Sequence, residues 1–193
     1  VEPAYQGVFG GRIDMNLSAR GQEQAHALAR YLQRHAFEAV YTSPMKRVQQ
    51  TLAPVLANGG PEPRIVADLR EVDFGDWTGL SWGEVEQRYG MSAFAWLDEL
   101  EAARVPNAES AQTLGARLEP HLRQILASHA GQQVAVFCHG GVIRMLMAML
   151  MRWPLSKMAS FQIEYASITR LGLLPHHTEL QLVNFTPWRD SHL

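Results

Sequence analysis

The sequence predicts an α/β fold, a three-layer sandwich whose mostly parallel central sheet carries helices on both faces. Short β-prone runs alternate with amphipathic helical segments along much of the chain. The apolar run at 134–138 is typical of a strand buried on both faces. Ser43 and His139 each follow a predicted strand directly, and the carboxyl ends of strands are where ligands of such sheets bind. These observations place a functional site at one edge of the sheet.

The length and charge of the chain favour a single domain that does not bind nucleic acid. The 193 residues can form a single domain, 1–193, that buries roughly 70% of its unfolded surface. A net charge of −2 without a basic block argues against nucleic acid as a partner. The longest apolar run, 145–151, is far shorter than the ~20 residues that span a membrane. A single cysteine, Cys138, excludes an internal disulfide, so we expect a cytoplasmic protein; the oligomeric state is not predicted.

The sequence of the first half of the chain predicts two helices that alternate with two strands. Ser18 is a suitable N-cap for an amphipathic helix from Ala19 to about His35. A β-prone run at 39–43 ends at Pro44, which suits the start of a helix running to Leu56. A short strand is expected at 64–67.

Regular periodicity fades in the region 68–107, which we expect to be an inserted, cap-like subdomain lying over the sheet. It is rich in aromatic side chains, namely Phe74, Trp77, Trp82, Tyr89, Phe94 and Trp96.

Helical and strand patterns return after this region. Apolar spacing from Ser110 predicts a further helix, with a kink or break near Leu118 because Pro120 removes a hydrogen bond. A buried strand at 134–138 and a buried helix at 142–151 follow. The chain ends in a predicted hairpin formed by 167–174 and 180–184.

Three separated residues have the chemistry of phosphoryl transfer. His139 stands between an apolar strand and Gly140-Gly141, which would place an acid/base group beside helix N-terminal amides. Arg47 lies in the first turn of its predicted helix, and Glu71 lies in a loop. A transferring phosphoryl group needs a guanidinium, a nucleophile and a proton donor. Taken singly, Arg47 and Glu71 would be ordinary surface residues; the combination carries the prediction.

The motifs that carry these residues resemble those of the histidine phosphatase superfamily, the phosphoglycerate mutase-like enzymes. They are Ser43-Pro44-Met45-Lys46-Arg47, Leu69-Arg70-Glu71 with Phe74-Gly75-Asp76-Trp77-Thr78-Gly79, Cys138-His139-Gly140-Gly141, and the loop Phe9-Gly10-Gly11. By this resemblance Arg47 and His139 bind the phosphate and Glu71 is the general acid. Gly140 then offers an amide to the phosphate, and the Gly10-Gly11 loop belongs to the substrate-binding region.

One family feature is absent from this sequence. The nucleophile of the family is the histidine of an Arg-His-Gly motif at the end of a first strand, and no such motif occurs here. The resemblance leads us to expect it immediately before Val1, together with the central strand of the sheet. Two smaller departures are Cys138 in place of a serine and Ala4 where many relatives have an asparagine.

The resemblance implies a metal-independent phosphomonoesterase of the α-ribazole phosphatase or broad-specificity branch. It would use a phosphohistidine intermediate on a small phosphorylated metabolite and need no cofactor. Phosphoglycerate mutase is a first alternative, although the adjacent arginine pair that mutases use is missing between Glu71 and His139.

Two further alternatives stay open. Cys138 and Arg144 fit the Cys-x5-Arg spacing of cysteine-dependent phosphatases, in which a thiolate attacks phosphorus. A pseudophosphatase would keep Arg47 and His139 to bind a phosphorylated ligand without turnover, but a binding module has no use for the proton donor Glu71.

Overall fold

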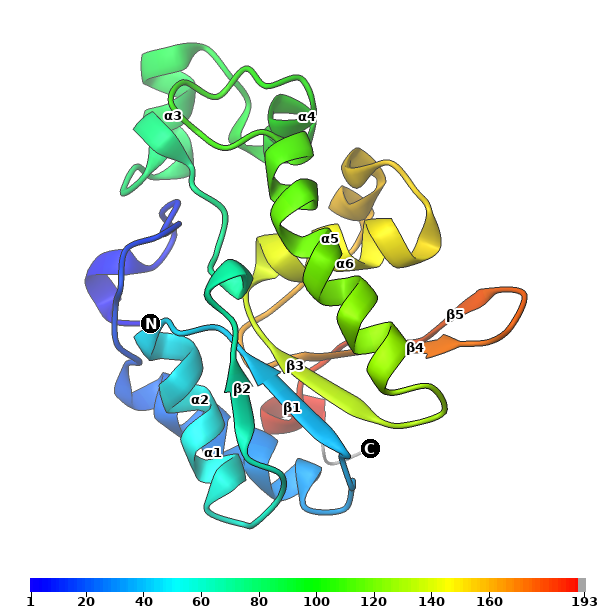
Figure 1. Cartoon of the computed structure of the whole chain (residues 1–193). Helices are drawn as coiled ribbons and strands as arrows, with labels where there is room; N and C mark the ends of the chain where they lie inside the picture. Colours follow the sequence, from blue (N-terminus) through cyan, green and yellow to red (C-terminus); the bar gives the residue numbers. More distant parts are fainter. Residues whose placement is uncertain (191–193) are drawn as a thin grey trace.

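The computed structural model describes residues 1–190 and contains two small sheets (Figure 1). The parallel sheet has the order β2-β1-β3, with β1 at Ala39–Thr42, β2 at Pro63–Ile65 and β3 at Val134–Phe137. The second is an antiparallel hairpin of β4, Ile168–Leu173, and β5, Thr178–Phe185. The predicted α/β class and the terminal hairpin are confirmed.

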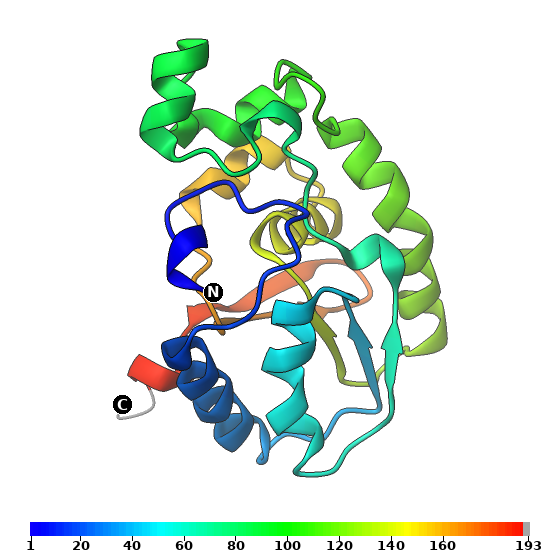
Figure 2. The same cartoon turned by 90° about the vertical axis from the view of Figure 1, so that its left-hand side faces the viewer.

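Helices lie on both sides of the parallel sheet (Figures 1 and 2). Helices α1, Ala19–Leu32, and α2, Lys46–Leu56, pack together on one side, and the short α7, Pro187–Asp190, packs on α1. Helices α5, Ala111–Ser128, and α6, Gly140–Met151, pack together on the other. This arrangement confirms the layers that the sequence predicts.

Local sequence explains where the central elements form. Helix α1 begins after Ser18, whose Oγ accepts a hydrogen bond from the Gly21 amide at 3.1 Å. Its inward face carries Ala25, Leu28 and Ala29, all at most 4% exposed. All four residues of β1 are buried, because strands pair with it on both edges. The apolar strand β3 pairs on one edge and is only partly buried.

The predicted break in the helix that follows Ser110 is wrong: α5 runs without interruption through Pro120. Proline removes only the hydrogen bond that residue 120 would donate to the carbonyl of Ala116. Leu114 and Leu118 are 1% and 0% exposed, so packing holds the helix before the proline. Smaller differences lie at helix ends, since α1 ends at Leu32 and α2 begins two residues after Pro44.

The aromatic-rich region forms a cap of short helices at the top of Figure 1. Its elements are η3, Gly75–Trp77, α3, Trp82–Tyr89, η4, Ala93–Ala95, and α4, Trp96–Glu101. Trp77 is fully buried at its centre, and the cap core is continuous with the core beneath α5 and α6.

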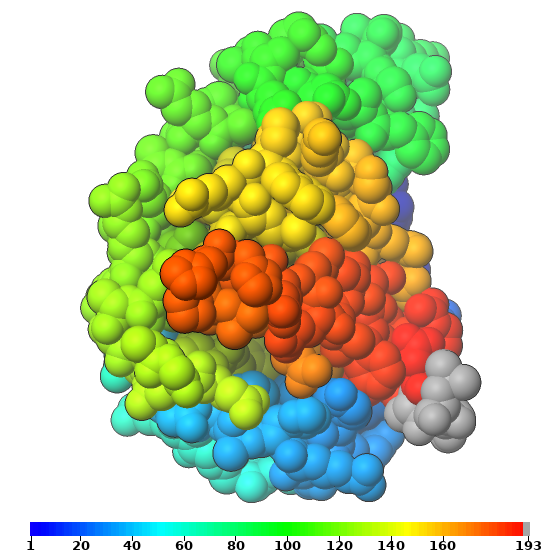
Figure 3. All heavy atoms as spheres, turned by 90° about the vertical axis from the view of Figure 1, so that its right-hand side faces the viewer, coloured from blue at the N-terminus to red at the C-terminus, as the bar shows by residue number. Residues whose placement is uncertain are grey.

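The remaining elements of the described residues are three short 3-10 helices. They are η1, Pro3–Tyr5, η2, Ala67–Leu69, and η5, Leu155–Ser160. Figure 3 shows hairpin β4–β5 across the middle of one face, below the α6–η5 region. In residues 1–190 no helix is long and apolar enough to span a membrane.

Candidate active site

The candidate site lies where β1 and β3 end. Thr42 pairs with Phe137, and the Ser43 amide donates to the Phe137 carbonyl at 2.9 Å, so the residues that follow the two strands are neighbours. Ser43 Oγ lies 2.8 Å from His139 Nε2, and both side chains are buried. The hydrogen bond fixes the orientation of the imidazole ring.

His139 is the N-cap of α6 and has extended backbone angles, φ −127° and ψ 163°. The helix therefore begins at Gly140, so its N-terminal amides lie at the site, and that of Gly141 donates to Glu71. Burial, followed by the charges of Arg47 and Arg117, lowers the pKa of His139 to about 2. The ring is neutral, and its Nε2 faces the Ser43 hydroxyl.

Glu71 reaches the first turn of the same helix from the loop after η2. Its Oε1 accepts from the Val72 amide at 2.9 Å, and its Oε2 accepts from the Gly141 amide at 3.3 Å. Only glycine fits at 141, because a Cβ there would lie 2.7 Å from Glu71 Oε1 and 2.5 Å from Val72 Cγ2. The second glycine of the motif thus makes room for the carboxyl group.

The pKa of Glu71 is raised, chiefly because burial disfavours the charged form. The amide of Val72 and the charge of Arg47 act in the opposite direction but are weaker. A carboxyl group of this kind holds its proton to higher pH than an exposed glutamate and can donate it.

Arg47 points back to the loop that contains the two predicted glycines. Its Nη1 donates to the Ile13 carbonyl at 2.8 Å and its Nη2 to the Gly11 carbonyl at 2.9 Å. The Gly10 carbonyl accepts from the Ile13 amide at 2.9 Å and so closes the turn that presents both acceptors. These acceptors are neutral, which leaves the positive charge of Arg47 available to an anion.

The structure brings together the residues of the sequence motifs, including Ser43 at its strand end, and adds Tyr165. Tyr165 is 59% exposed, yet it is close enough to Arg47 and Glu71 for their charges to act on its pKa, which partial desolvation raises. It precedes the terminal hairpin, far from the motifs in sequence, so no local pattern could identify it.

The surroundings of Cys138 and Arg144, the two residues with Cys-x5-Arg spacing, do not favour a cysteine nucleophile. Burial raises the pKa of the Cys138 thiol to about 12, so the thiolate is scarce near neutral pH. Arg144 donates to the carbonyls of Gly140 at 3.2 Å and Phe161 at 3.1 Å and lies 5.8 Å from the centre of the Trp96 ring. It ties the start of α6 to the segment after η5.

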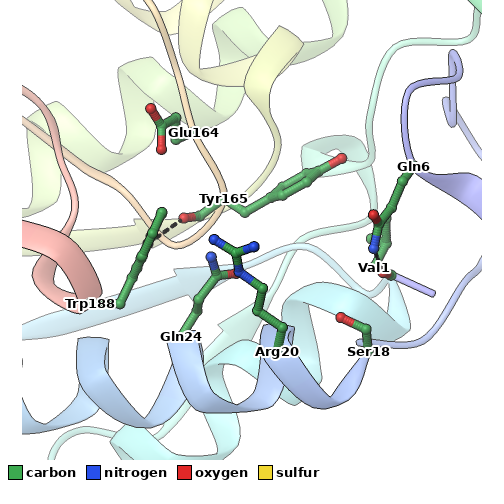
Figure 4. Close-up of a pocket in the computed structure, with 8 residues that line it drawn as sticks. All are labelled: Val1, Gln6, Ser18, Arg20, Gln24, Glu164, Tyr165 and Trp188. Carbon is green, nitrogen blue, oxygen red and sulfur yellow. Dashed lines mark hydrogen bonds between the residues drawn. The ribbon is translucent and has the colours of Figure 1, made fainter. Parts of the chain in front are cut away.

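A small pocket adjoins this site at the first residue of the chain (Figure 4). Val1 is buried, and its backbone nitrogen lies within range of the charge of Arg47. The Tyr165 side chain extends toward Val1 and Gln6, and the backbone carbonyl of Tyr165 accepts a hydrogen bond from Trp188 Nε1 at 3.0 Å.

Within residues 1–190, no three His, Cys, Asp or Glu side chains gather as metal ligands would.

Comparison with known proteins identifies the family. The profile of the histidine phosphatase superfamily (branch 1) matches residues 1–186. The chain belongs to this superfamily. It is 28% identical to phosphoserine phosphatase 1 of Hydrogenobacter thermophilus, over 93% of this chain and 85% of that protein. It is 27% identical to the adenosylcobalamin/α-ribazole phosphatase of Escherichia coli, over 92% and 88% of the two chains.

Other members of the superfamily share the fold or higher local identity. A mycobacterial glucosyl-3-phosphoglycerate phosphatase superposes with a TM-score of 0.82 at 25% identity, covering 93% of this chain and 91% of the other. A 2,3-bisphosphoglycerate-dependent phosphoglycerate mutase of Methylobacterium radiotolerans is 36% identical over 74% of this chain and 71% of its own. Family membership and the named phosphatases identify this chain as an enzyme of the histidine phosphatase type.

Proposed function

We propose that the protein is a phosphomonoesterase that hydrolyses a small phosphorylated metabolite through a phosphohistidine intermediate, without a metal ion. Arg47, His139 and the amide of Gly140 bind the phosphoryl group, and Glu71 protonates the leaving oxygen. The Gly10-Gly11 loop forms part of the substrate-binding wall. The observation that carries the proposal is the partly buried Glu71 side chain, whose carboxyl group accepts a hydrogen bond from the Gly141 amide two residues after His139.

The nucleophile in this proposal is a histidine on a segment that precedes Val1 in the full-length protein. Two features support it. The edge of β3 that faces away from β1 has no strand partner among residues 1–190, although β3 is entirely apolar. The backbone nitrogen of Val1, from which such a segment would continue, lies within range of the Arg47 charge. A strand added at β3 would end beside Arg47 and His139.

The test is to trap and characterise the phosphoenzyme of the full-length protein. After brief mixing with labelled substrate and a denaturing quench, we expect a phosphoramidate on histidine, which is labile in acid and stable in base. Peptide mass spectrometry locates the label. An acid-stable thiophosphate on Cys138, or no phosphoenzyme during rapid turnover, would contradict the proposal.

Phosphoglycerate mutase is the second candidate because one mutase relative is 36% identical to this chain. The sequence still lacks an adjacent arginine pair between Glu71 and His139 to hold a second acidic group. Assays with 3-phosphoglycerate separate the two activities: a phosphatase releases inorganic phosphate, whereas a mutase interconverts the 2- and 3-isomers. We expect phosphate release from monoesters to dominate.

A further inference from the structure

The loop that carries Glu71 is held by an ion pair between Arg117, in α5, and Glu109, which lies two residues before that helix begins. Arg117 and Glu109 form a two-pronged pair, with Nε to Oε2 at 2.9 Å and Nη2 to Oε1 at 2.8 Å. Their side chains are only 14% and 6% exposed. A fork of this kind holds both partners in one geometry.

Both members of the pair also bind the backbone of the loop, on either side of Glu71. Arg117 donates through Nη1 to the carbonyl of Asp68 and through Nη2 to that of Glu71 itself, at 3.3 Å. Glu109 Oε1 accepts from the Asp73 amide at 2.8 Å, and the Glu109 amide donates to the Asp73 carbonyl at 3.1 Å. The segment from η2 to Asp73 is therefore held at three residues, Asp68, Glu71 and Asp73.

The direction of the Glu71 side chain depends on this support. Its own hydrogen bonds come from the adjacent Val72 amide and from amides in the first turn of α6, that of Gly141 at 3.3 Å. Arg117 and Glu109 instead bind the backbone of Asp68, Glu71 and Asp73. These hydrogen bonds fix the position of the Glu71 Cα and therefore the direction in which the side chain points toward α6. Small displacements of a catalytic group are costly, since an error of about 1 Å reduces a rate by ~10²-fold.

We infer that Arg117, paired with Glu109, is a positioning residue that aims the general acid Glu71 at the leaving oxygen. This inference rests on the proposed function of Glu71. Arg117 itself touches neither substrate nor phosphate in this scheme and acts through the loop backbone. Substitution of Arg117 should therefore slow only the step in which Glu71 donates its proton. Loss of a merely structural ion pair would not be confined to that step.

The experiment compares R117K and E109Q with the unsubstituted full-length protein on two esters. Lysine keeps the charge of Arg117 but cannot bind Glu109 and two carbonyls at once. On an alkyl phosphate we expect kcat to fall by ~10²-fold. On p-nitrophenyl phosphate, whose leaving group needs little protonation, kcat should change little, and so should inhibition by inorganic phosphate.

The matched control is R123K on the same helix, which alters the exposed i,i+4 pair of Arg123 with Glu119. It should leave both rates unchanged. Thermal unfolding of each variant identifies any loss of fold, and E109Q provides the second reading if R117K unfolds. Uniform losses on both esters in the variant that remains folded would overturn the inference.

The double variant R117K/E71Q separates this inference from the proposed function. If Arg117 acts through Glu71, the double variant is no slower on the alkyl ester than E71Q alone. Multiplying losses would assign Arg117 a separate role and overturn the inference. Failure of the proposed function looks different, because E71Q itself would then slow both esters equally.

Discussion

Glu71 combines a raised pKa with a place at the helix N-terminus that anions favour. Because burial raises its pKa, the protonated form persists to higher pH than in an exposed glutamate, and activity should decline as Glu71 ionises. We expect E71Q to slow alkyl phosphates by ~10²-fold or more and to spare p-nitrophenyl phosphate. The alkaline limb of the kcat/KM profile should disappear from E71Q. An unchanged limb would assign the titration to another group.

A substitution of Arg47 tests whether this side chain belongs to the phosphate-binding site. Its guanidinium is held by the carbonyls of Gly11 and Ile13, so its remaining donors have a defined direction. In R47K a single ammonium replaces the planar fork, and we expect kcat/KM to fall by ~10²-fold on alkyl and aryl esters alike. R30K, at an exposed position near the end of α1, is the control. Comparable kinetics in R47K and R30K would remove Arg47 from the site.

Cys138 distinguishes the two phosphatase chemistries. With a thiol pKa of about 12, Cys138 offers little nucleophile near pH 7. We expect C138S to keep activity close to that of the unsubstituted protein and the thiol to react slowly with iodoacetamide. Initial rates and alkylation time courses measure both. Abolished turnover in C138S, with its fold intact, would support the cysteine mechanism instead.

At the scale of elements, the cap depends on one close backbone approach. Gly75 has φ of +50°, and a Cβ there would collide with the backbone of Pro106, Asn107 and Ala108. We expect G75A to lower the free energy of unfolding by roughly 2–4 kcal/mol. Gly90 at the end of α3 has φ of +63° but open space around it, so G90A should cost about 1 kcal/mol. Urea unfolding measures both, and equal losses would mean that the collision is relieved.

The elements also show how far sequence reasoning reaches. Periodicity located α1, α6 and the hairpin, and the strand-end motifs located Arg47 and His139, because these signals are local. Continuity of α5 through Pro120 depends on the burial of Leu114 and Leu118, which no local pattern contains. Likewise, the contacts of Arg117 with the Glu71 loop join residues 46 or more positions apart.

At the scale of the molecule, the two sheets leave one edge open beside the site. Among residues 1–190, strand β3 pairs only with β1, and hairpin β4–β5 forms a separate sheet. A parallel sheet in an α/β protein is ordinarily covered and paired at its centre, and an apolar edge strand invites pairing. Under the proposed function, the segment that precedes Val1 pairs there and brings the nucleophilic histidine to Arg47 and His139.

Hydrogen exchange tests this pairing directly. If a segment precedes Val1 as proposed, the amides of β3 that face away from β1 should exchange more slowly in the longer protein than in the 193-residue chain, because the added strand would accept their hydrogen bonds. Amides of β2, at the opposite edge, are the internal control and should exchange alike in both proteins. The urea dependence of unfolding should also steepen, since more surface becomes buried. Unchanged exchange at β3, together with a phosphoenzyme on histidine, would place the nucleophile on a segment that reaches the site without joining the sheet.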